Sequence, residues 1–273
     1  MNKNWTGERL ETEILNNNTL EHLHRYSIAI YFSKNRTVLD IACGEGYGSN
    51  LLAQVADSVL GVDVSSQTIA EAQKKYIHSN LTFKEGRADK IPSSNSTFDV
   101  VVSFETIEHH DQHEAMMMEI KRVLKPNGIL IISSPDKLNY SIKRKYANPF
   151  HVKELFIEEF KGLIQSYFKH SQFYQQRSMY CSAIMQEHQQ IGDPYRFSGS
   201  YMEINTNGFD PLYHLCLASD EPVPPFPTSF FDDNIVIKSQ IDQAVNAVRN
   251  SFRYRIGDFI MLPFSLLKLI RSK

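Results

Sequence analysis

The chain has 273 residues, of which 42% are hydrophobic and 22% are charged, so it has enough apolar mass for a globular core. Its formal net charge of −2 gives no global field that would attract nucleic acid, and we expect no nucleic-acid partner. The cysteines are far apart and form no CxxC pair, which argues against a zinc site or a disulfide framework. The polar N-terminus has no signal-peptide pattern, so a cytoplasmic location is the default expectation.

A first helix is predicted to begin at Asn18, because Asn18 and Glu21 have the spacing of a capping box. This helix carries Arg25 and Tyr26, which either belong to a polar helix face or close over the charged end of a ligand. From residue 38 onward, apolar runs typical of buried strands alternate with helical patterns. The strands are expected over 38–42, 59–62, 81–84, 99–104 and 129–133, with helices over 49–56, 65–77 and 112–124.

The alternation becomes less regular after residue 133, where we expect a helix over 152–166 and strands over 168–175 and 211–218. Segments 136–150 and 177–208 are interpreted as insertions. The predicted organisation is a main domain over 1–220 with a cap over 1–36, a proline-rich linker over 221–234 and a helical tail over 235–273.

Strands that alternate with helices predict a parallel sheet with helices on both faces, and such sheets bind ligands beyond the C-terminal ends of their strands. The first strand is followed by a glycine-rich loop, Gly44-Glu45-Gly46-Tyr47-Gly48. Glycines there let the backbone approach a ligand, and the N–H groups of the next helix face it. Asp63 ends the second strand, about 20 residues beyond the loop, where a βαβ nucleoside site places its ribose-binding acid.

Five segments together resemble the class I S-adenosylmethionine-dependent methyltransferases of the UbiE/type-11 kind. They are VLDIACGEGYGS at 38–49, GVDVS at 61–65, GRADKIP at 86–92, FDVVVSFETIEH at 98–109 and KRVLKPNGILIISSP at 121–135. The resemblance implies a Rossmann-like α/β fold with a seven-stranded, mostly parallel sheet. Its antiparallel last strand would lie between strands five and six.

The resemblance also implies S-adenosyl-L-methionine as the cofactor. By position, Asp40 and residues 44–46 would line its methionine part, and Asp63 would bind both ribose hydroxyls. Ala88 and Asp89 would hold the adenine edge. The full set of expected cofactor-binding residues is Tyr26, Asp40, Ala42, Gly44, Gly46, Asp63, Val64, Ala88, Asp89 and Phe104.

Three further segments are similar to a methyltransferase subgroup found in bacterial glycan and surface-polysaccharide gene sets. They are TGER at 6–9, HLHRY at 22–26 and NPFHVKEL at 148–155. This similarity favours a hydroxyl of a sugar, nucleotide-sugar or glycan as the methyl acceptor. The alternatives are a small-molecule N- or O-methyltransferase of secondary metabolism, and a cofactor-binding module without catalytic activity.

A hydroxyl acceptor must lose its proton, which requires a general base or a metal ion. The segment 105–110 follows the fourth strand and carries the residues for either chemistry. Its acidic and histidine side chains are hydrogen-bonded scaffolding, or they form a catalytic set of Glu108, His109 and His151 with one histidine as the base. In a third interpretation Glu105, Glu108, His109 and His151 bind a divalent cation, as in small-RNA 3′-end and ubiquinone-pathway methyltransferases. Two carboxylates and two imidazoles suit manganese, iron or zinc better than magnesium.

The C-terminal segment 251–273 is strongly apolar, interrupted by Pro263 and flanked by basic residues. It is too short and broken for a confident membrane span. We expect either docking on its own domain or on a second subunit, or peripheral contact with the anionic inner face of a membrane.

Overall fold

The computed structural model describes residues 12, 15–179, 197–199, 201–202, 204–206, 210–252, 254 and 256. The expectations for residues 1–11, for Cys181 with most of the insertion 177–208, and for the tail beyond residue 256 concern residues outside this set. Among the helices of the described residues, none has the length and apolar character needed to cross a membrane.

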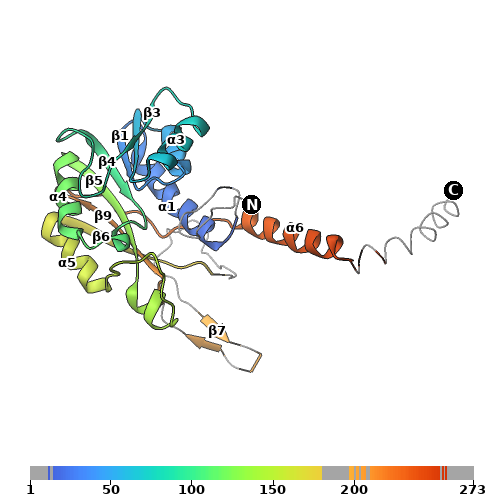
Figure 1. The fold of residues 1–273 in the computed structure, drawn as a ribbon. Helices are drawn as coiled ribbons and strands as arrows, with labels where there is room; N and C mark the ends of the chain where they lie inside the picture. The colour runs from blue at the N-terminus through green and yellow to red at the C-terminus, as the bar shows by residue number, and fades with distance from the viewer. Residues whose placement is uncertain are drawn as a thin grey trace, which may run out of the picture.

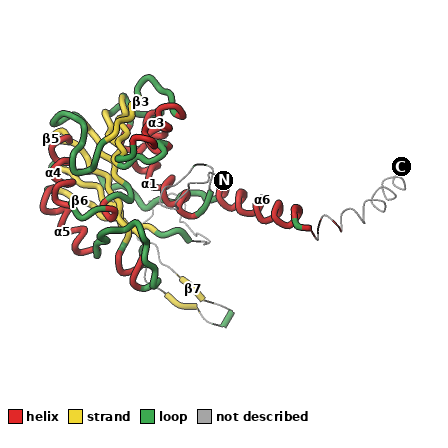
Figure 2. Tube along the Cα trace, in the orientation of Figure 1, coloured by secondary structure: helices red, strands yellow, loops and turns green. Residues whose placement is uncertain are grey.

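A seven-stranded sheet forms the centre of the molecule, in the order β3-β2-β1-β4-β5-β9-β6 (Figures 1 and 2). β9 pairs antiparallel with both β5 and β6, and the other neighbouring strands pair in parallel. This confirms the predicted fold class, including the antiparallel strand inserted near the edge. The strands are β1 Thr37–Ile41, β2 Ser58–Asp63, β3 Leu81–Glu85, β4 Phe98–Ser103, β5 Leu124–Pro135, β6 His170–Gln176 and β9 Tyr213–Ser219.

Helices cover both faces of this sheet because successive residues of its strands point to opposite sides. In β1, Leu39 packs into an apolar cluster with α4 and α5 residues, whereas Val38 packs into a second cluster with α1 and α2 residues. The helix α6 extends away from the body of the molecule (Figure 1). The helices are α1 Asn17–Ser33, α2 Tyr47–Ala53, α3 Ser66–Lys75, α4 His113–Val123, α5 Ile157–Tyr167 and α6 Asn234–Asn250.

Two short helical turns and one small hairpin complete the described elements. The 3-10 turn η1, Ile107–His109, follows β4, and the π-helical turn η2, Lys137–Ile142, follows β5. The strands β7, Phe197–Gly199, and β8, Ile204–Thr206, pair with each other outside the main sheet. Both turns therefore begin at the C-terminal edge of the sheet, where a ligand is expected.

The first helix begins earlier than its predicted capping box. Its N-cap is Asn16, whose side chain accepts a hydrogen bond from the Thr19 N–H at 3.1 Å, while Thr19 Oγ1 accepts one from the Asn16 N–H at 3.1 Å. The prediction of Asn18 and Glu21 was wrong because three consecutive asparagines offer a cap, and a threonine can reciprocate as a glutamate does. Glu21 is instead buried and accepts a hydrogen bond from Ser178.

The predicted helix over 152–166 is shorter in the structure and begins at Ile157. The N–H groups of Val152 and Lys153 donate to the carbonyl of Glu108 at 2.8 and 3.0 Å. These hydrogen bonds hold the segment before α5 against η1, so it cannot continue the helix toward the N-terminus. As a consequence, His151 is placed next to the end of β4.

Candidate active site

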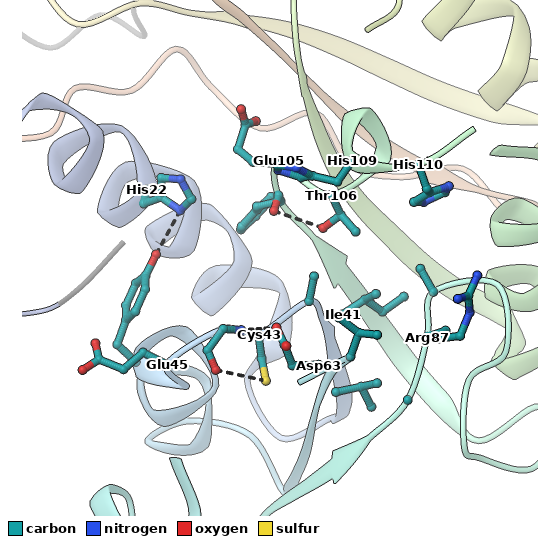
Figure 3. Close-up of a pocket in the computed structure, with 18 of the residues that line it drawn as sticks. His22, Ile41, Cys43, Glu45, Asp63, Arg87, Glu105, Thr106, His109 and His110 are labelled. Atoms are coloured by element: carbon teal, nitrogen blue, oxygen red, sulfur yellow. Dashed lines mark hydrogen bonds between the residues drawn. The ribbon is translucent and has the colours of Figure 1, made fainter. Parts of the chain in front are cut away.

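A cavity of about 360 Å³ lies at the C-terminal ends of β1, β2 and β4. Figure 3 shows side chains from several loops and from α1 surrounding it. Its volume falls within the range of about 300–1,000 Å³ that is typical of small-molecule sites. Its lining includes most of the expected cofactor-binding residues, namely Tyr26, Ala42, Gly44, Asp63, Val64, Ala88, Asp89 and Phe104.

The glycine-rich loop forms the floor of the cavity and begins α2. Gly44 faces open space, since a Cβ atom added to it would meet nothing within 4 Å. Gly46 is the N-cap of α2 with a φ of +88°, a left-handed conformation that side chains rarely adopt. An added Cβ at Gly46 would also lie 2.8 Å from Phe83 Cζ, so glycine is required at this turn even though Gly46 does not itself line the cavity.

Asp63 is fixed at the end of β2 by two backbone donors. Its Oδ2 accepts a hydrogen bond from the Gly44 N–H at 3.0 Å, and its Oδ1 accepts one from the Ser65 N–H at 2.9 Å. The residue is only 5% exposed, and that remaining surface faces the cavity. The carboxylate therefore ties the glycine-rich loop to the start of α3 and presents a preorganised acceptor to a ligand.

Asp40 lies behind the cavity wall. It is 1% exposed, and its carboxylate accepts hydrogen bonds from Tyr26 Oη at 3.1 Å and from Ser49 Oγ at 2.7 Å. Burial raises its pKa to about 7. Tyr26 lines the cavity, so Asp40 acts on a ligand through the position of the Tyr26 ring.

At the other end of the cavity, Arg87 and Asp89 form an ion pair with Nε to Oδ1 2.8 Å, which lowers the pKa of Asp89. His110 also lines this end and is half-buried (Figure 3). Its Nδ1 lies 3.1 Å from the Gln112 N–H, and its buried Nε2 has no hydrogen-bond partner. Burial, followed by the nearby His113, lowers the pKa of His110, so the ring is neutral near pH 7.

In addition to Tyr26, the helix α1 and its N-cap contribute cavity-lining residues that the sequence did not predict. Asn16, Asn18 and His22 line the cavity, and His22 Nδ1 lies 2.9 Å from Tyr47 Oη (Figure 3). Burial lowers the pKa of His22 well below its usual range. The helical pattern predicted the spacing of these residues, but it did not predict that their side of the helix would face the cavity.

Arg25 is unavailable to a ligand because it is 1% exposed and paired inside the protein. Its guanidinium forms an ion pair with Glu105, donates to Ser133 Oγ at 3.0 Å and lies over the Tyr213 ring at 4.7 Å. Glu105 also accepts a hydrogen bond from Ser133 Oγ at 2.7 Å and has a left-handed φ of +50°. These contacts occupy Glu105, the first of the four expected metal ligands, although it lines the cavity.

The other three expected ligands come together. One ligand atom from each of Glu108, His109 and His151 lies within 4.8 Å of the others. His109 Nε2 is 3.9 Å from Glu108 Oε1, and the two imidazole rings meet edge to face with centroids 5.2 Å apart. His109 also lines the cavity, so this cluster adjoins the space that a ligand would fill (Figure 3).

Glu108 is an unusual member of this cluster. It is 1% exposed, and neither of its carboxylate oxygens has a hydrogen-bond partner. Burial, and then the charge of Glu105, raise the pKa of Glu108 well above its usual range. A buried carboxylate without hydrogen-bond partners is costly, and either a proton on the carboxyl group or a cation beside it would remove that cost.

Comparisons with known proteins find similarity to methyltransferases. Residues 39–132 match a family model described as a methyltransferase domain. A probable S-adenosylmethionine-dependent methyltransferase of Mycolicibacterium smegmatis is 33% identical over 59% of this chain and 63% of its own length. A ubiquinone biosynthesis O-methyltransferase of Azorhizobium caulinodans is 30% identical over 40% of this chain and 43% of its own length. The chain thus spans less than two thirds of the curated relatives named here.

Solved structures share the fold at low sequence identity. An S-adenosylmethionine-dependent methyltransferase from Thermotoga maritima has a TM-score of 0.54 and 16% identity, covering 74% of this chain and 91% of that one. A protein from Pyrococcus horikoshii has a TM-score of 0.50 and 22% identity, covering 75% and 91%. Residues 39–132 are therefore similar to a methyltransferase domain, and the sheet order is the one expected for the class I, S-adenosylmethionine-dependent type.

Proposed function

We propose that the protein is an S-adenosylmethionine-dependent O-methyltransferase that acts on a hydroxyl of a sugar, nucleotide-sugar or glycan. One observation carries this proposal: His109 belongs both to the lining of the cavity and to the Glu108–His109–His151 cluster. A donor bound in the cavity would therefore have its reactive end beside groups that can deprotonate a hydroxyl.

The residues of the cavity fit the cofactor. The open space at Gly44 and the fixed carboxylate of Asp63 suit a nucleoside ribose, and Ala88 with Asp89 suits the adenine edge. The rings of Tyr26 and Phe104, with centroids 5.1 Å apart, form the wall nearest the end of β4. When bound, S-adenosylmethionine supplies an electrophilic methyl group on a sulfonium.

The protein's part in the reaction is to position the acceptor and to remove its proton. In an in-line displacement the hydroxyl oxygen forms a bond to the methyl carbon, the carbon–sulfur bond breaks, and its electron pair stays on sulfur. The hydroxyl proton passes to an imidazole nitrogen of His109 or His151. Holding both reactants in near-attack geometry supplies much of the acceleration expected for such a step.

A divalent cation also fits the cluster. Glu108 has two buried oxygens without partners, and the imidazoles of His109 and His151 add two nitrogen donors. One carboxylate with two imidazoles is a ligand set that suits manganese, iron or zinc. A cation there would acidify a bound hydroxyl and would compensate the buried charge of Glu108.

The segment that carries His151 supports the proposed acceptor class. This segment, NPFHVKEL at 148–155, is one of those that resemble methyltransferases of glycan gene sets, and it places polar side chains beside the cluster. The relatives include proteins named for O-methylation of fatty acids and for ubiquinone biosynthesis, and these names support oxygen as the accepting atom.

The test is transfer of labelled methyl groups from S-adenosylmethionine to a panel of nucleotide sugars, lipid-linked glycans, fatty acids and polyphenols. We expect a sugar hydroxyl to be methylated by the wild type, and His109→Ala to lower the rate at least about 100-fold, as for removal of a general base. The matched control is His170→Ala, since His170 is an exposed histidine at the start of β6.

Two outcomes would count against the proposal. Transfer to no member of the panel, with S-adenosylmethionine bound, would support a cofactor-binding module instead. Methylation of the fatty acids or polyphenols alone would remove the sugar assignment, and full activity of His109→Ala would remove the role assigned to the cluster.

A further inference from the structure

Glu154 has no role in the account so far, yet it holds one of the two imidazoles of the cluster. We propose that Glu154 is a positioning residue that orients His151 and fixes its tautomer, so that Nε2 is the nitrogen offered to the acceptor's proton or to a divalent cation. The expected effect on catalysis rests on the proposed function, whereas the contacts that orient His151 do not depend on it.

The contact between the two side chains is short and buried. His151 Nδ1 lies 2.5 Å from Glu154 Oε1, and the two side chains are 8% and 9% exposed. Ser141 Oγ donates to the same carboxylate oxygen at 2.7 Å. A carboxylate held by a hydroxyl and facing a ring nitrogen is an arrangement that orients histidines in metal and catalytic sites.

The neighbouring amide identifies the tautomer. Asn148 Oδ1 accepts a hydrogen bond from the Phe150 N–H at 3.1 Å, so its amide nitrogen is the atom that faces His151 Nε2 at 2.9 Å. An amide nitrogen only donates, and therefore Nε2 accepts. In the neutral ring the hydrogen is then on Nδ1, and Nδ1–H donates a hydrogen bond to the Glu154 carboxylate.

The second imidazole of the cluster follows the same rule. His109 Nδ1 lies 3.1 Å from the carbonyl oxygen of Phe150, which can only accept. Both rings thus donate from Nδ1 to fixed oxygens and keep the lone pair on Nε2. Phe150 links the two arrangements, because its N–H fixes Asn148 and its carbonyl fixes His109.

The π-helical turn η2 completes the support of His151. Tyr140 stacks on the His151 ring with centroids 5.4 Å apart and an interplanar angle of 22°, and the next residue is Ser141. Asp136 caps this turn by accepting a hydrogen bond from the Leu138 N–H at 3.1 Å. Single π-helical turns often occur at functional sites, and this one supplies both the ring stack and the hydroxyl that hold the pair.

Asn148 lies on the side from which a substrate or a cation would reach Nε2 of His151. Its amide donor occupies the position that an acceptor hydroxyl would take when it donates to the same lone pair. Asn148 is half-buried and lies in a largely exposed loop, so turning its amide away would break the hydrogen bond from the Phe150 N–H but would not open the core. The cluster therefore has a donor in place that a substrate or a cation would displace.

The direct measurement is the tautomer of His151 in the full-length protein, read from long-range ¹H–¹⁵N correlation spectra at a pH where the ring is neutral. His151→Gln assigns its signal among the 10 histidines. We expect the Nδ1–H form in the wild type and in Glu154→Gln, which keeps an acceptor oxygen. Glu154→Ala should lower the methyl-transfer rate about 10–100-fold with the KM for S-adenosylmethionine unchanged. Because the Asn148 amide also selects the tautomer, the effect of Glu154 on it is read without that amide: Asn148→Ala should keep the Nδ1–H form, and the double variant Asn148→Ala/Glu154→Ala should lose it.

The matched control is Glu158→Ala, which removes an exposed glutamate paired with Lys161 and should change neither the tautomer nor the rate. An Nε2–H tautomer in the wild type would overturn the proposal, and this test needs no variant other than His151→Gln for the assignment. A retained Nδ1–H form in the folded double variant Asn148→Ala/Glu154→Ala would also overturn it. Because the spectra need neither cofactor nor acceptor, absence of methyl transfer would refute the proposed function and leave this result standing.

Discussion

The hydroxyl of Tyr26 donates to the buried carboxylate of Asp40, with Oη to Oδ1 3.1 Å, and Gly48 is what allows it to reach that position. A Cβ atom added to Gly48 would lie 1.9 Å from Cζ of Tyr26. The ring of Tyr26 lines the cavity, so a glycine on α2, an acid on β1 and a tyrosine on α1 together shape one wall of the candidate site.

Gly48→Ala should displace Tyr26. Because both residues are buried, overpacking should lower the free energy of unfolding by roughly 1–3 kcal/mol. We also expect weaker binding of S-adenosylmethionine, since the displaced ring is part of the cavity. Urea denaturation and calorimetry measure the two effects.

Gly162→Ala is the matched control for this substitution, because Gly162 lies on the exposed side of α5 and an added Cβ there meets nothing within 4 Å. It should leave binding unchanged and raise stability by about 0.5–1 kcal/mol. Equal stability and affinity in Gly48→Ala and the wild type would show that Tyr26 is not constrained by Gly48.

The raised pKa of Asp40 predicts how the stability of the protein depends on pH. Its pKa is raised from 3.8 to about 7 by burial, so between these values the folded state holds a proton that the unfolded state has lost. Stability therefore falls as pH rises through this window, by about 1.4 kcal/mol per pH unit from this group. Asp40→Asn removes the contribution, and its destabilisation relative to the wild type should be smaller at pH 8 than at pH 5. A constant difference in denaturation free energy between these pH values would contradict the shift.

The Glu108–His109–His151 cluster also predicts how a chelator should affect methyl transfer. If Glu108, His109 and His151 hold a divalent cation, excess chelator should abolish methyl transfer and manganese should restore it. If one histidine is the base alone, transfer should persist in chelator and still be lost in His109→Ala. Full activity in excess chelator would eliminate the metal interpretation, and cation binding that survives in His151→Ala would exclude His151 as a ligand.

Local sequence patterns were sufficient to predict the parts of the site whose residues lie close to one another in the sequence. The alternation of strands and helices predicted the sheet, and the glycine-rich loop with Asp63 predicted the nucleoside end, because the geometry of a βαβ unit follows from local spacing. The predicted N-cap of the first helix was two residues too late, because any of several adjacent asparagines can cap the helix and the structure uses Asn16.

The remaining parts depend on contacts between distant segments. Arg25 was a candidate to face a ligand, but it is buried against Glu105 and Tyr213, which are 80 or more residues away. His110 was not among the expected cofactor-binding or metal-binding residues, yet the fold places it on the cavity wall. Ser141 lies in no motif, and Glu154 lies within NPFHVKEL without a predicted role, because their contact forms only when η2 and the segment before α5 pack together.

Calorimetric titration of S-adenosylmethionine into the wild type and into Asp63→Ala tests the central claim that this cavity holds the methyl donor on Asp63. Hydrogen bonds to a charged group contribute about 1.5–3 kcal/mol each, so loss of two should weaken binding at least about 100-fold. Asp57→Ala, which removes an exposed acid just before the opposite end of β2, should bind like the wild type. Affinity of Asp63→Ala equal to that of the wild type, or no binding by the wild type, would contradict the account.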